Sequence, residues 1–478
     1  MRNRIESLER VAKQLEPNAK ARQKLRAEVI AHTESYLEGV YDRPAFVETE
    51  SQGMGIYQSP IMEEAMPFPE MLSLIKSEVD HPGLRPASPG HLGYIPGGGL
   101  YPSALGDYMA DIGNHYAGIL FASPGAVRVE NMLVRWMCDI FGYGKGSGGN
   151  LTSGGSIANL MGVVTARDAA KIKAKDFERL VLYMSEQTHH CAHKAIRIAG
   201  LGEAHIRNVP LDERFRMSVE GLAQMVEQDK AQGLIPFMLI ASVGTTDTGA
   251  VDPLPELHAI TQKHNIWLHV DAAYGGFFVL CPEGQEQIRG IELADSIVVD
   301  PHKGLFLPYG TGAFLIKKVE LLHQSHYYKA NYMQDTQQLA DELSPADLSP
   351  ELTKHFRGLR LWVPLKLFGL KPFRAALSEK IWLTRYFYEE IQKIEGMEVG
   401  PFPDLSVMIF RYVPQKGNPN DFNQKLVWAI HKDGRVFLSS TMIDGIFYIR
   451  LAVLCFRTHL VTIEKCLEMI RICLSSIA

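Results

Sequence analysis

Short apolar runs alternate with helical patterns through the middle of the chain, and this alternation constrains the fold more than any other feature. The runs are rich in Ile, Val, Leu and Phe: Leu180–Met184, Phe237–Val243, Ile266–Val270 and Ser296–Asp300. A helical pattern over Ala158–Lys175 precedes them. Strands buried on both faces have this composition, and intervening helices order them into a mostly parallel sheet. We therefore predict an α/β fold with helices on both faces of the sheet.

The flanking regions have different patterns. Residues 5–40 predict charged helices interrupted at Pro17, and residues 50–100 are rich in Pro and Gly, as in a loop lining a site. The polar stretch 325–350 predicts a mobile lid. After about residue 370, helices and strands alternate again in a smaller α/β unit. The expected division is an N-terminal helical and irregular segment, a large cofactor-binding domain and a small C-terminal domain: 1–100, 101–365 and 366–478.

Composition excludes several classes of function. The chain has 49 basic and 54 acidic residues, a formal net charge of −5, and no basic patch for nucleic acid or anionic membrane. No secretory apolar segment follows Met1, and the longest apolar runs, such as Ile235–Val243, are too short to cross a membrane. The six cysteines are scattered without a pairing pattern, which indicates free thiols and a cytoplasmic protein.

Polar residues follow two of the predicted strands, where ligands of α/β sheets gather. Asp271 ends the run Ile266–Val270, and His302 and Lys303 follow Ser296–Asp300. A lysine at this place could be partly desolvated, which would lower its pKa and prepare it for imine chemistry. Taken singly, each residue also fits an ordinary structural role, Asp271 as a turn cap and Lys303 as a surface residue.

A third feature is the small-residue stretch Asn150–Asn159, which contains Ser153-Gly154-Gly155-Ser156 at the start of a helical pattern. Free backbone N–H groups and the positive end of the helix dipole make such a start an anion site. The stretch has neither a Walker motif nor a dinucleotide fingerprint, and on its own it fits a plain N-cap. Together the three features supply a phosphate cradle, a carboxylate for a ring cation and an imine-forming lysine. A phosphorylated pyridine aldehyde needs this set.

At this point the chain resembles a known family. His269-Val270-Asp271-Ala272-Ala273-Tyr274 and Asp300-Pro301-His302-Lys303 resemble motifs of the group II pyridoxal-phosphate-dependent amino acid decarboxylases, most of all the aromatic-amino-acid branch. The resemblance runs from the Tyr94 region to Arg450-Leu451-Ala452. It implies a carboxy-lyase of fold type I, the aspartate aminotransferase type. It also implies pyridoxal 5'-phosphate as cofactor and a homodimer with active sites at the interface, in which the N-terminal segment packs on the partner.

The resemblance also assigns roles residue by residue. Lys303 would hold the cofactor as an internal aldimine, Asp271 would pair with the protonated pyridine nitrogen, and His189 would stack over the ring. The other expected cofactor contacts are Gly154, Gly155, Ser156 and His302 at the phosphate, Ala273 under the ring, the Thr246 hydroxyl, and Asp300, where many relatives carry Asn.

Protonation after carbon dioxide leaves is assigned to Tyr332 or His189. Tyr332 matches the tyrosine of the family's lid, although Tyr327 and Tyr328 leave the alignment of this loop open by a few residues. Relatives that oxidise their substrate are often altered at this tyrosine or at the stacking histidine, so Tyr332 and His189 favour simple decarboxylation.

The substrate is expected to contact Tyr94, Pro96, Gly97 and Arg450. Arg450 interrupts the apolar run Phe447–Phe456, so it binds a substrate carboxylate, shapes the site or reaches solvent. Small residues at 97–99 and at Gly118 suggest room for an aromatic side chain, although a neighbour could fill the space that a glycine leaves.

Several alternatives stay open. They are decarboxylation of glutamate, diaminobutyrate, histidine or a sulfinate, oxidative aldehyde synthesis or another reaction on the same scaffold, and a non-catalytic dimeric paralogue. A zinc site at His189-His190-Cys191 is not expected, because this spacing does not place three ligands around one metal.

Overall fold

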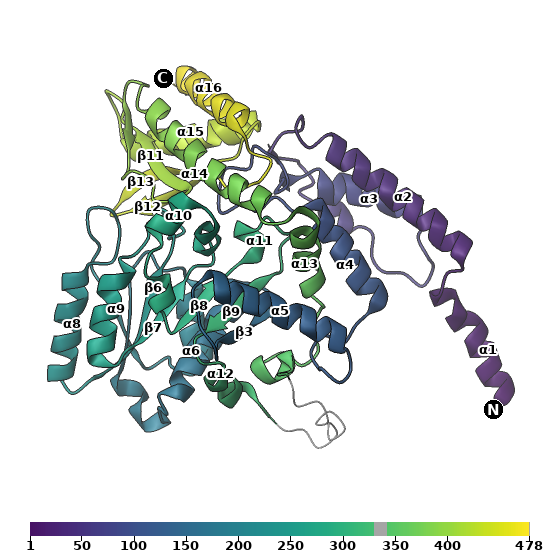
Figure 1. Ribbon diagram of the computed structural model, residues 1–478. Helices are drawn as coiled ribbons and strands as arrows, with labels where there is room; N and C mark the ends of the chain where they lie inside the picture. Colours follow the sequence, from purple (N-terminus) through teal and green to yellow (C-terminus); the bar gives the residue numbers. More distant parts are fainter. Residues whose placement is uncertain (329–341, 478) are drawn as a thin grey trace.

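A seven-stranded sheet forms the centre of the computed structural model, which describes residues 1–328 and 342–477 (Figure 1). The strand order is β3-β9-β8-β7-β6-β4-β5, and β9 alone runs antiparallel to its neighbours. The strands are β3 (Gly148–Thr152), β4 (Leu180–Met184), β5 (His205–Asn208), β6 (Ile235–Ser242), β7 (Trp267–Asp271), β8 (Ser296–Val299) and β9 (Gly312–Ile316). This is the mostly parallel α/β sheet that the sequence predicts.

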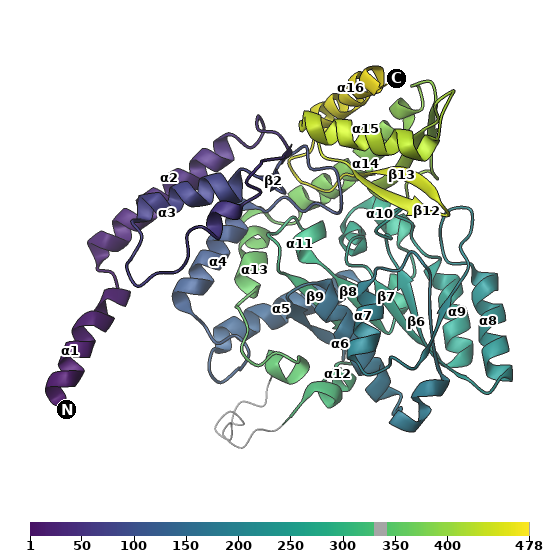
Figure 2. The same cartoon turned by 180° about the vertical axis from the view of Figure 1, so that it is seen from behind.

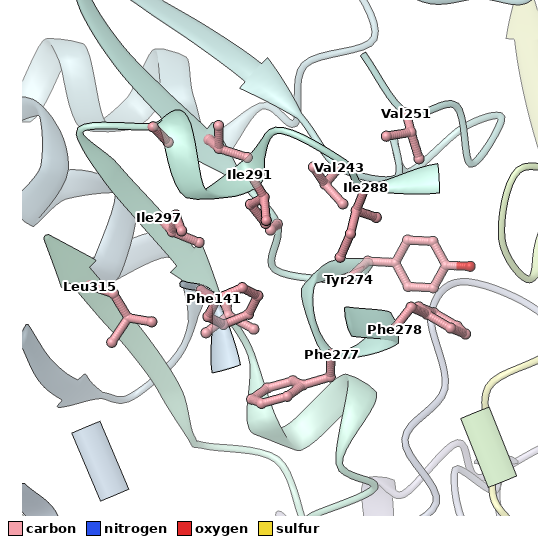
Figure 3. Close-up of a cluster of buried hydrophobic side chains, with 14 of the residues drawn as sticks. Phe141, Val243, Val251, Tyr274, Phe277, Phe278, Ile288, Ile291, Ile297 and Leu315 are labelled. Atoms are coloured by element: carbon pink, nitrogen blue, oxygen red, sulfur yellow. The ribbon is translucent and has the colours of Figure 1, made fainter. Parts of the chain in front are cut away.

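Helices cover both faces of this sheet because alternate strand residues point to opposite sides. Val181, Leu239 and Val270 pack with α5 (Pro124–Ile140), α8 (Val219–Ala231) and α9 (Leu254–His264) in one core cluster. Figure 3 shows part of this cluster, in which Ile297 and Leu315 of neighbouring strands face Phe141. The opposite face packs against α6 (Gly155–Ala169), α7 (Cys191–Ile198) and α12 (Val319–His326). Both faces are thus buried, as the apolar composition of the strands requires.

A second, antiparallel sheet belongs to the smaller C-terminal α/β unit, seen from behind in Figure 2. Its order is β10-β11-β13-β12, with strands Met397–Val399 (β10), Val407–Tyr412 (β11), Ser439–Ile443 (β12) and Ile446–Ala452 (β13). Its own apolar core joins the sheet to α14 (Lys371–Ile391), α15 (Pro419–Asp433) and α16 (Leu460–Ile477).

The N-terminal segment is the most extended part of the molecule (Figure 1). Helix α1 (Arg2–Ala12) projects from the body and buries none of its residues. It is followed by α2 (Ala19–Glu38) and α3 (Phe68–Ile75) and by the short antiparallel pair β1 (Phe46–Val47) and β2 (Gly83–Leu84). The remaining helices are α4 (Tyr101–Gly113), which packs on α13 (Gly358–Phe368), and the short α10 (Pro282–Gln287) and α11 (Pro301–Gly304).

The four predicted strands are present, shifted by no more than two residues, but β3 was not predicted. Its sequence, Gly-Gly-Asn-Leu-Thr, has only one residue type that indicates a strand, the terminal Thr152, and begins with two glycines. The structure gives the reason: a Cβ atom on Gly149 would lie 2.0 Å from the carbonyl oxygen of Phe314 on β9. Predicted helix Ala158–Lys175 begins three residues earlier, at Gly155, and ends at Ala169. In the described part of the chain, the helices are all too short or too polar to cross a membrane.

Burial of His91 makes stability depend on pH. The side chain is 1% exposed at the junction with the C-terminal sheet, where its ring meets Phe437 edge-on. Burial lowers its pKa from 6.5 to about 4. Below pH 6.5 this histidine therefore binds a proton in the unfolded chain but not in the folded chain. The free energy of unfolding falls as the pH drops towards 4. At pH 5 the loss from one such histidine is about 2 kcal/mol.

We predict that His91→Leu loses about 2 kcal/mol less stability than the wild type between pH 7.5 and pH 5. Denaturant unfolding at both pH values measures the difference. The same loss in both proteins would contradict the burial argument.

Candidate active site

A cavity of about 300 Å³ lies where the loops after β3, β4, β6, β7 and β8 converge. The carboxyl ends of the four parallel strands β4, β6, β7 and β8 meet at this edge, so residues far apart in the sequence lie side by side. All ten residues expected to contact the cofactor line the cavity: Gly154, Gly155, Ser156, His189, Thr246, Asp271, Ala273, Asp300, His302 and Lys303.

Lys303 lies on α11, the short helix that follows β8. Its ammonium Nζ is 3.2 Å from Oδ2 of Asp300, three residues earlier, which is itself 2% exposed. Burial opposes the charge of Lys303, but the carboxylates of Asp300 and Asp271 outweigh it, so the pKa of Lys303 is raised. The expectation of a lowered pKa is wrong, because it considered desolvation without the two carboxylates. In the protein without cofactor, Lys303 is therefore a cation paired with carboxylates.

Asp271 ends β7 with both carboxylate oxygens engaged. Oδ1 accepts the backbone N–H of Ala273 at 3.1 Å, and Oδ2 accepts the side-chain amide of Asn159 at 3.1 Å. The carboxylate is thereby fixed at the cavity wall, with its charge balanced by donors from two elements.

The start of α6 forms a glycine-lined cradle. Gly154 has φ +154°, a backbone conformation that other residues rarely adopt, and α6 begins at the next residue. A Cβ atom on Gly155 would lie 3.0 Å from Oδ2 of Asp300. His302 reaches the same place, since its Cε1 is 3.7 Å from the Cβ position of Gly154. Backbone N–H groups at a helix start of this kind bind phosphate.

His189 is held in one orientation above this edge. Its Nδ1 accepts the backbone N–H of Cys191 at 3.3 Å, and its ring lies 4.1 Å from the ring of His190. Burial lowers the pKa of His189, and the neighbouring His190 and Lys303 act in the same direction against Asp271. A neutral His189 therefore carries its proton on Nε2 and offers it to the cavity.

The expected substrate contacts are placed differently, because Tyr94, Pro96, Gly97 and Arg450 are absent from the lining of this cavity. Tyr94 is 57% exposed, and its ring lies 5.5 Å from that of Phe437. Pro96 is buried, and a Cβ atom on Gly97 would lie 2.1 Å from the carbonyl oxygen of His302. Gly97 thus allows the backbone to lie directly against the segment that carries Lys303.

The argument that glycines leave room for a large substrate is therefore wrong for most of the positions concerned. The Cβ position of Gly98 is occupied by Cys455 and Phe456, and that of Gly118 lies 2.5 Å from the carbonyl oxygen of Leu352. Only Gly99, of these four glycines, faces open space within 4 Å. Gly97 and Gly118 thus allow close packing against backbone, and Gly98 allows close packing against side chains, so these three glycines leave no room for a substrate.

Arg450 forms a clamp within the chain. Its guanidinium donates to the carbonyl oxygens of Thr246 and Asp247, the latter at 2.9 Å, and to Oγ of Ser439 at 2.7 Å. It also reaches the carbonyl oxygen of Tyr94 at 3.5 Å. The geometry favours the site-forming role over a substrate contact, since Arg450 holds the loop that carries Thr246.

Tyr332 lies outside the described residues, so its role stays a prediction. The two neighbouring tyrosines are described, and neither lines the cavity. Tyr327 stacks on His323 at 4.7 Å, and Tyr328 is 90% exposed.

The residues of the cavity fit pyridoxal 5'-phosphate. An amine, a fixed carboxylate and a glycine-rich helix start match the aldehyde, the ring nitrogen and the phosphate. Two buried oxygens, Oε1 of Gln187 and Oδ1 of Asp300, lack a hydrogen-bond partner among the described residues, and both residues line the cavity. Sequence reasoning missed Gln187 and also Asn159. Asn159 stands one helical turn after Gly155, and this spacing was the available signal.

Comparison with known proteins identifies the family. Residues 63–413 match the pyridoxal-dependent decarboxylase conserved domain. The chain belongs to this family. It is a carboxy-lyase of the pyridoxal-phosphate-dependent type, and its fold is that of the family.

Individual relatives cover most of the chain. An aromatic-L-amino-acid decarboxylase of Bacillus atrophaeus is 33% identical over 82% of this chain and 80% of its own length. A phenylacetaldehyde synthase of Petunia hybrida is 31% identical over 83% and 82%. The crystal structure of Catharanthus roseus tryptophan decarboxylase with L-tryptophan superposes with a TM-score of 0.87 at 26% identity, covering 97% of this chain and all of that one.

We predict that Arg450→Met lowers the free energy of unfolding by roughly 2–4 kcal/mol and weakens cofactor binding, because buried carbonyls lose their donors. Thermal unfolding and equilibrium dialysis with pyridoxal phosphate measure the two effects. Arg411→Met is the matched control on the same sheet, where the arginine pairs with the exposed Glu398. An unchanged melting temperature with a raised KM would instead assign Arg450 to the substrate.

Proposed function

We propose that this decarboxylase converts an aromatic L-amino acid to the corresponding amine and carbon dioxide, with the cofactor held on Lys303. The observation that carries the proposal is the convergence of Lys303, Asp271 and the glycine cradle on one cavity. When bound, the cofactor supplies the electron sink that accepts the pair released with carbon dioxide.

The chain's own groups prepare that chemistry. Lys303 must lose a proton before its Nζ can attack an aldehyde, and Oδ2 of Asp300, 3.2 Å away, is placed to accept it. Asp271 would hold the ring nitrogen in its protonated form, because an adjacent anion favours the cation. His189 would cover the ring, and the glycine cradle with Ser156 and His302 would hold the phosphate.

We assign the remaining roles in the same way. Ala273 would lie under the ring, Thr246 would offer its hydroxyl to the cofactor, and Tyr332 would return a proton to Cα, with Nε2–H of His189 as the other donor. Tyr94, Pro96 and Gly97 would shape the substrate site indirectly, because they belong to the segment that packs against His302. Arg450 would fix the loop that carries Thr246.

The aromatic substrate class rests on the relatives, since the glycines do not support it. The Bacillus atrophaeus enzyme is named for aromatic amino acids, and the solved Catharanthus roseus enzyme holds L-tryptophan. Oxidative aldehyde synthesis is the second candidate, because the Petunia hybrida relative is an aldehyde synthase.

We further propose a homodimer in the cytoplasm, divided into segments 1–100, 101–365 and 366–478. Support for the dimer comes from apolar side chains that lie exposed on the first and fourth helices: Ile5, Leu8, Val11, Tyr108, Met109 and Ile112. A second copy would cover them, with α1 packed on the partner. The six cysteines are buried and free of disulfides, which supports a reducing compartment.

The direct test is a panel of common L-amino acids, with carbon dioxide, amine, aldehyde and keto acid measured for each. We expect carbon dioxide and amine in equal amounts from tyrosine, tryptophan or phenylalanine. Lys303→Ala should lower this turnover by at least about 10³-fold, because the nucleophile is lost. Normal turnover in Lys303→Ala, or activity confined to non-aromatic substrates, would contradict the proposal.

Tyr332→Phe tests the assignment of the proton donor. Without the hydroxyl, protonation of Cα slows and oxygen competes, so we expect more aldehyde, ammonia and hydrogen peroxide per carbon dioxide. Tyr328→Phe, four residues earlier, is the matched control and should behave like the wild type. An unchanged amine yield in Tyr332→Phe would show that another group donates the proton.

A further inference from the structure

Behind Asp271, a chain of buried polar side chains runs from the sheet into helix α6. Nε1 of Trp267 donates to Oγ of Ser296 at 2.9 Å, and this hydroxyl lies 2.8 Å from Nδ1 of His269. Nε2 of His269 lies 3.0 Å from Oδ1 of Asn159, whose Nδ2 donates to Oδ2 of Asp271 at 3.1 Å. Asn159, His269 and Ser296 are at most 1% exposed.

The donor and acceptor chemistry of these side chains allows the hydrogen bonds of this series to run in only one direction. Asp271 and the carbonyl oxygen of Gly155, 3.0 Å from Nδ2 of Asn159, can only accept hydrogen bonds, so the amide nitrogen of Asn159 faces both. Oδ1 of Asn159 then faces His269 and requires a proton on Nε2.

The surroundings of His269 determine which ring nitrogen carries its proton. Burial lowers the pKa of His269 to about 4, so the ring is neutral at pH 7 and its Nδ1 is bare. Nδ1 must therefore accept the hydroxyl hydrogen of Ser296, and that oxygen in turn accepts from Trp267, whose indole can only donate. The donors point from Trp267 to Asp271 without a conflict.

Helix α6 is shaped to admit this histidine. A Cβ atom on Gly162, three residues after Asn159, would lie 2.6 Å from Cε1 of His269. Any side chain at 162 would displace the ring. Gly162 thus lets α6 approach β7 closely enough for Asn159 to reach Asp271.

We propose that Asn159 is a positioning residue for Asp271, and that the chain Trp267–Ser296–His269 fixes the orientation of its amide. Asn159 holds one carboxylate oxygen by a charge-assisted hydrogen bond and leaves the carboxylate turned towards the ring nitrogen of the cofactor. This inference rests on the proposed pairing of Asp271 with that nitrogen.

The test compares two ligands that differ at one atom. Pyridoxal phosphate has the ring nitrogen that Asp271 pairs with, and the 1-deaza analogue has a C–H group in its place. Both carry the aldehyde and the phosphate, so Lys303 and the glycine cradle treat them alike. In the wild type we expect tighter binding of pyridoxal phosphate, measured by equilibrium dialysis of the full-length protein. No preference there would overturn both the role of Asp271 and this inference.

Asn159→Leu should weaken the binding of pyridoxal phosphate about 10- to 100-fold, which is the range expected for losing a hydrogen bond to a charged group. It should weaken the binding of the deaza analogue less than about 3-fold. Thr165→Val is the matched control. It removes a buried hydroxyl on the same helix, hydrogen-bonded to Ser325 at 3.3 Å, and should weaken neither ligand.

Equal weakening of both ligands in Asn159→Leu, or of neither, would overturn the inference, because a merely structural asparagine does not distinguish them. Ser296→Ala is the second variant in case Asn159→Leu does not fold, since it leaves Asn159 and Asp271 in place. It should weaken the binding of pyridoxal phosphate by about 3- to 10-fold and leave the binding of the deaza analogue unchanged. Unchanged binding in Ser296→Ala would show that the orientation of Asn159 does not depend on the chain behind it.

Discussion

The attraction of the Lys303 ammonium to the carboxylates of Asp300 and Asp271 is the interaction on which the site depends. A buried cation needs a partner, and Asp300 supplies one at 3.2 Å on the same turn of chain while Asp271 acts from the neighbouring strand. The two carboxylates exceed the one ammonium, so the cavity favours a second cation. A protonated pyridine ring would meet that demand, and the backbone N–H groups at the start of α6 would hold the phosphate.

The sheet makes this arrangement possible. Asp271 is the last residue of β7, and Lys303 follows β8. The two strands are adjacent and parallel, so both side chains are brought to one edge without a long loop. Glycines on the surrounding elements allow close approach of neighbouring groups, namely of β9 to Gly149 beside it, of His302 to Gly97 and of His269 to Gly162. The precision of the site thus comes from close backbone packing as much as from the reactive groups.

Much of this was readable from the sequence. Apolar runs predicted β4, β6, β7 and β8 because a fully buried strand needs such residues, and the strand ends located Asp271 and Lys303. β3 was not predicted because it begins with two glycines, of which Gly149 is required by the close approach of the β9 backbone. The direction of the pKa shift of Lys303 was also not predicted, since it depends on where the side chain of Asp300, the residue before α11, lies. Asn159 looked like a helix residue, and only the approach of β7 shows its contact with Asp271.

The most direct test of the account is the identity of the lysine that captures the cofactor. The full-length protein is incubated with pyridoxal phosphate, reduced with borohydride, digested and mapped by mass spectrometry. The account predicts one phosphopyridoxyl group per chain, on the peptide that contains Lys303, and no label there in the presence of excess competing aldehyde. A label on another lysine, or none after reduction, would contradict it.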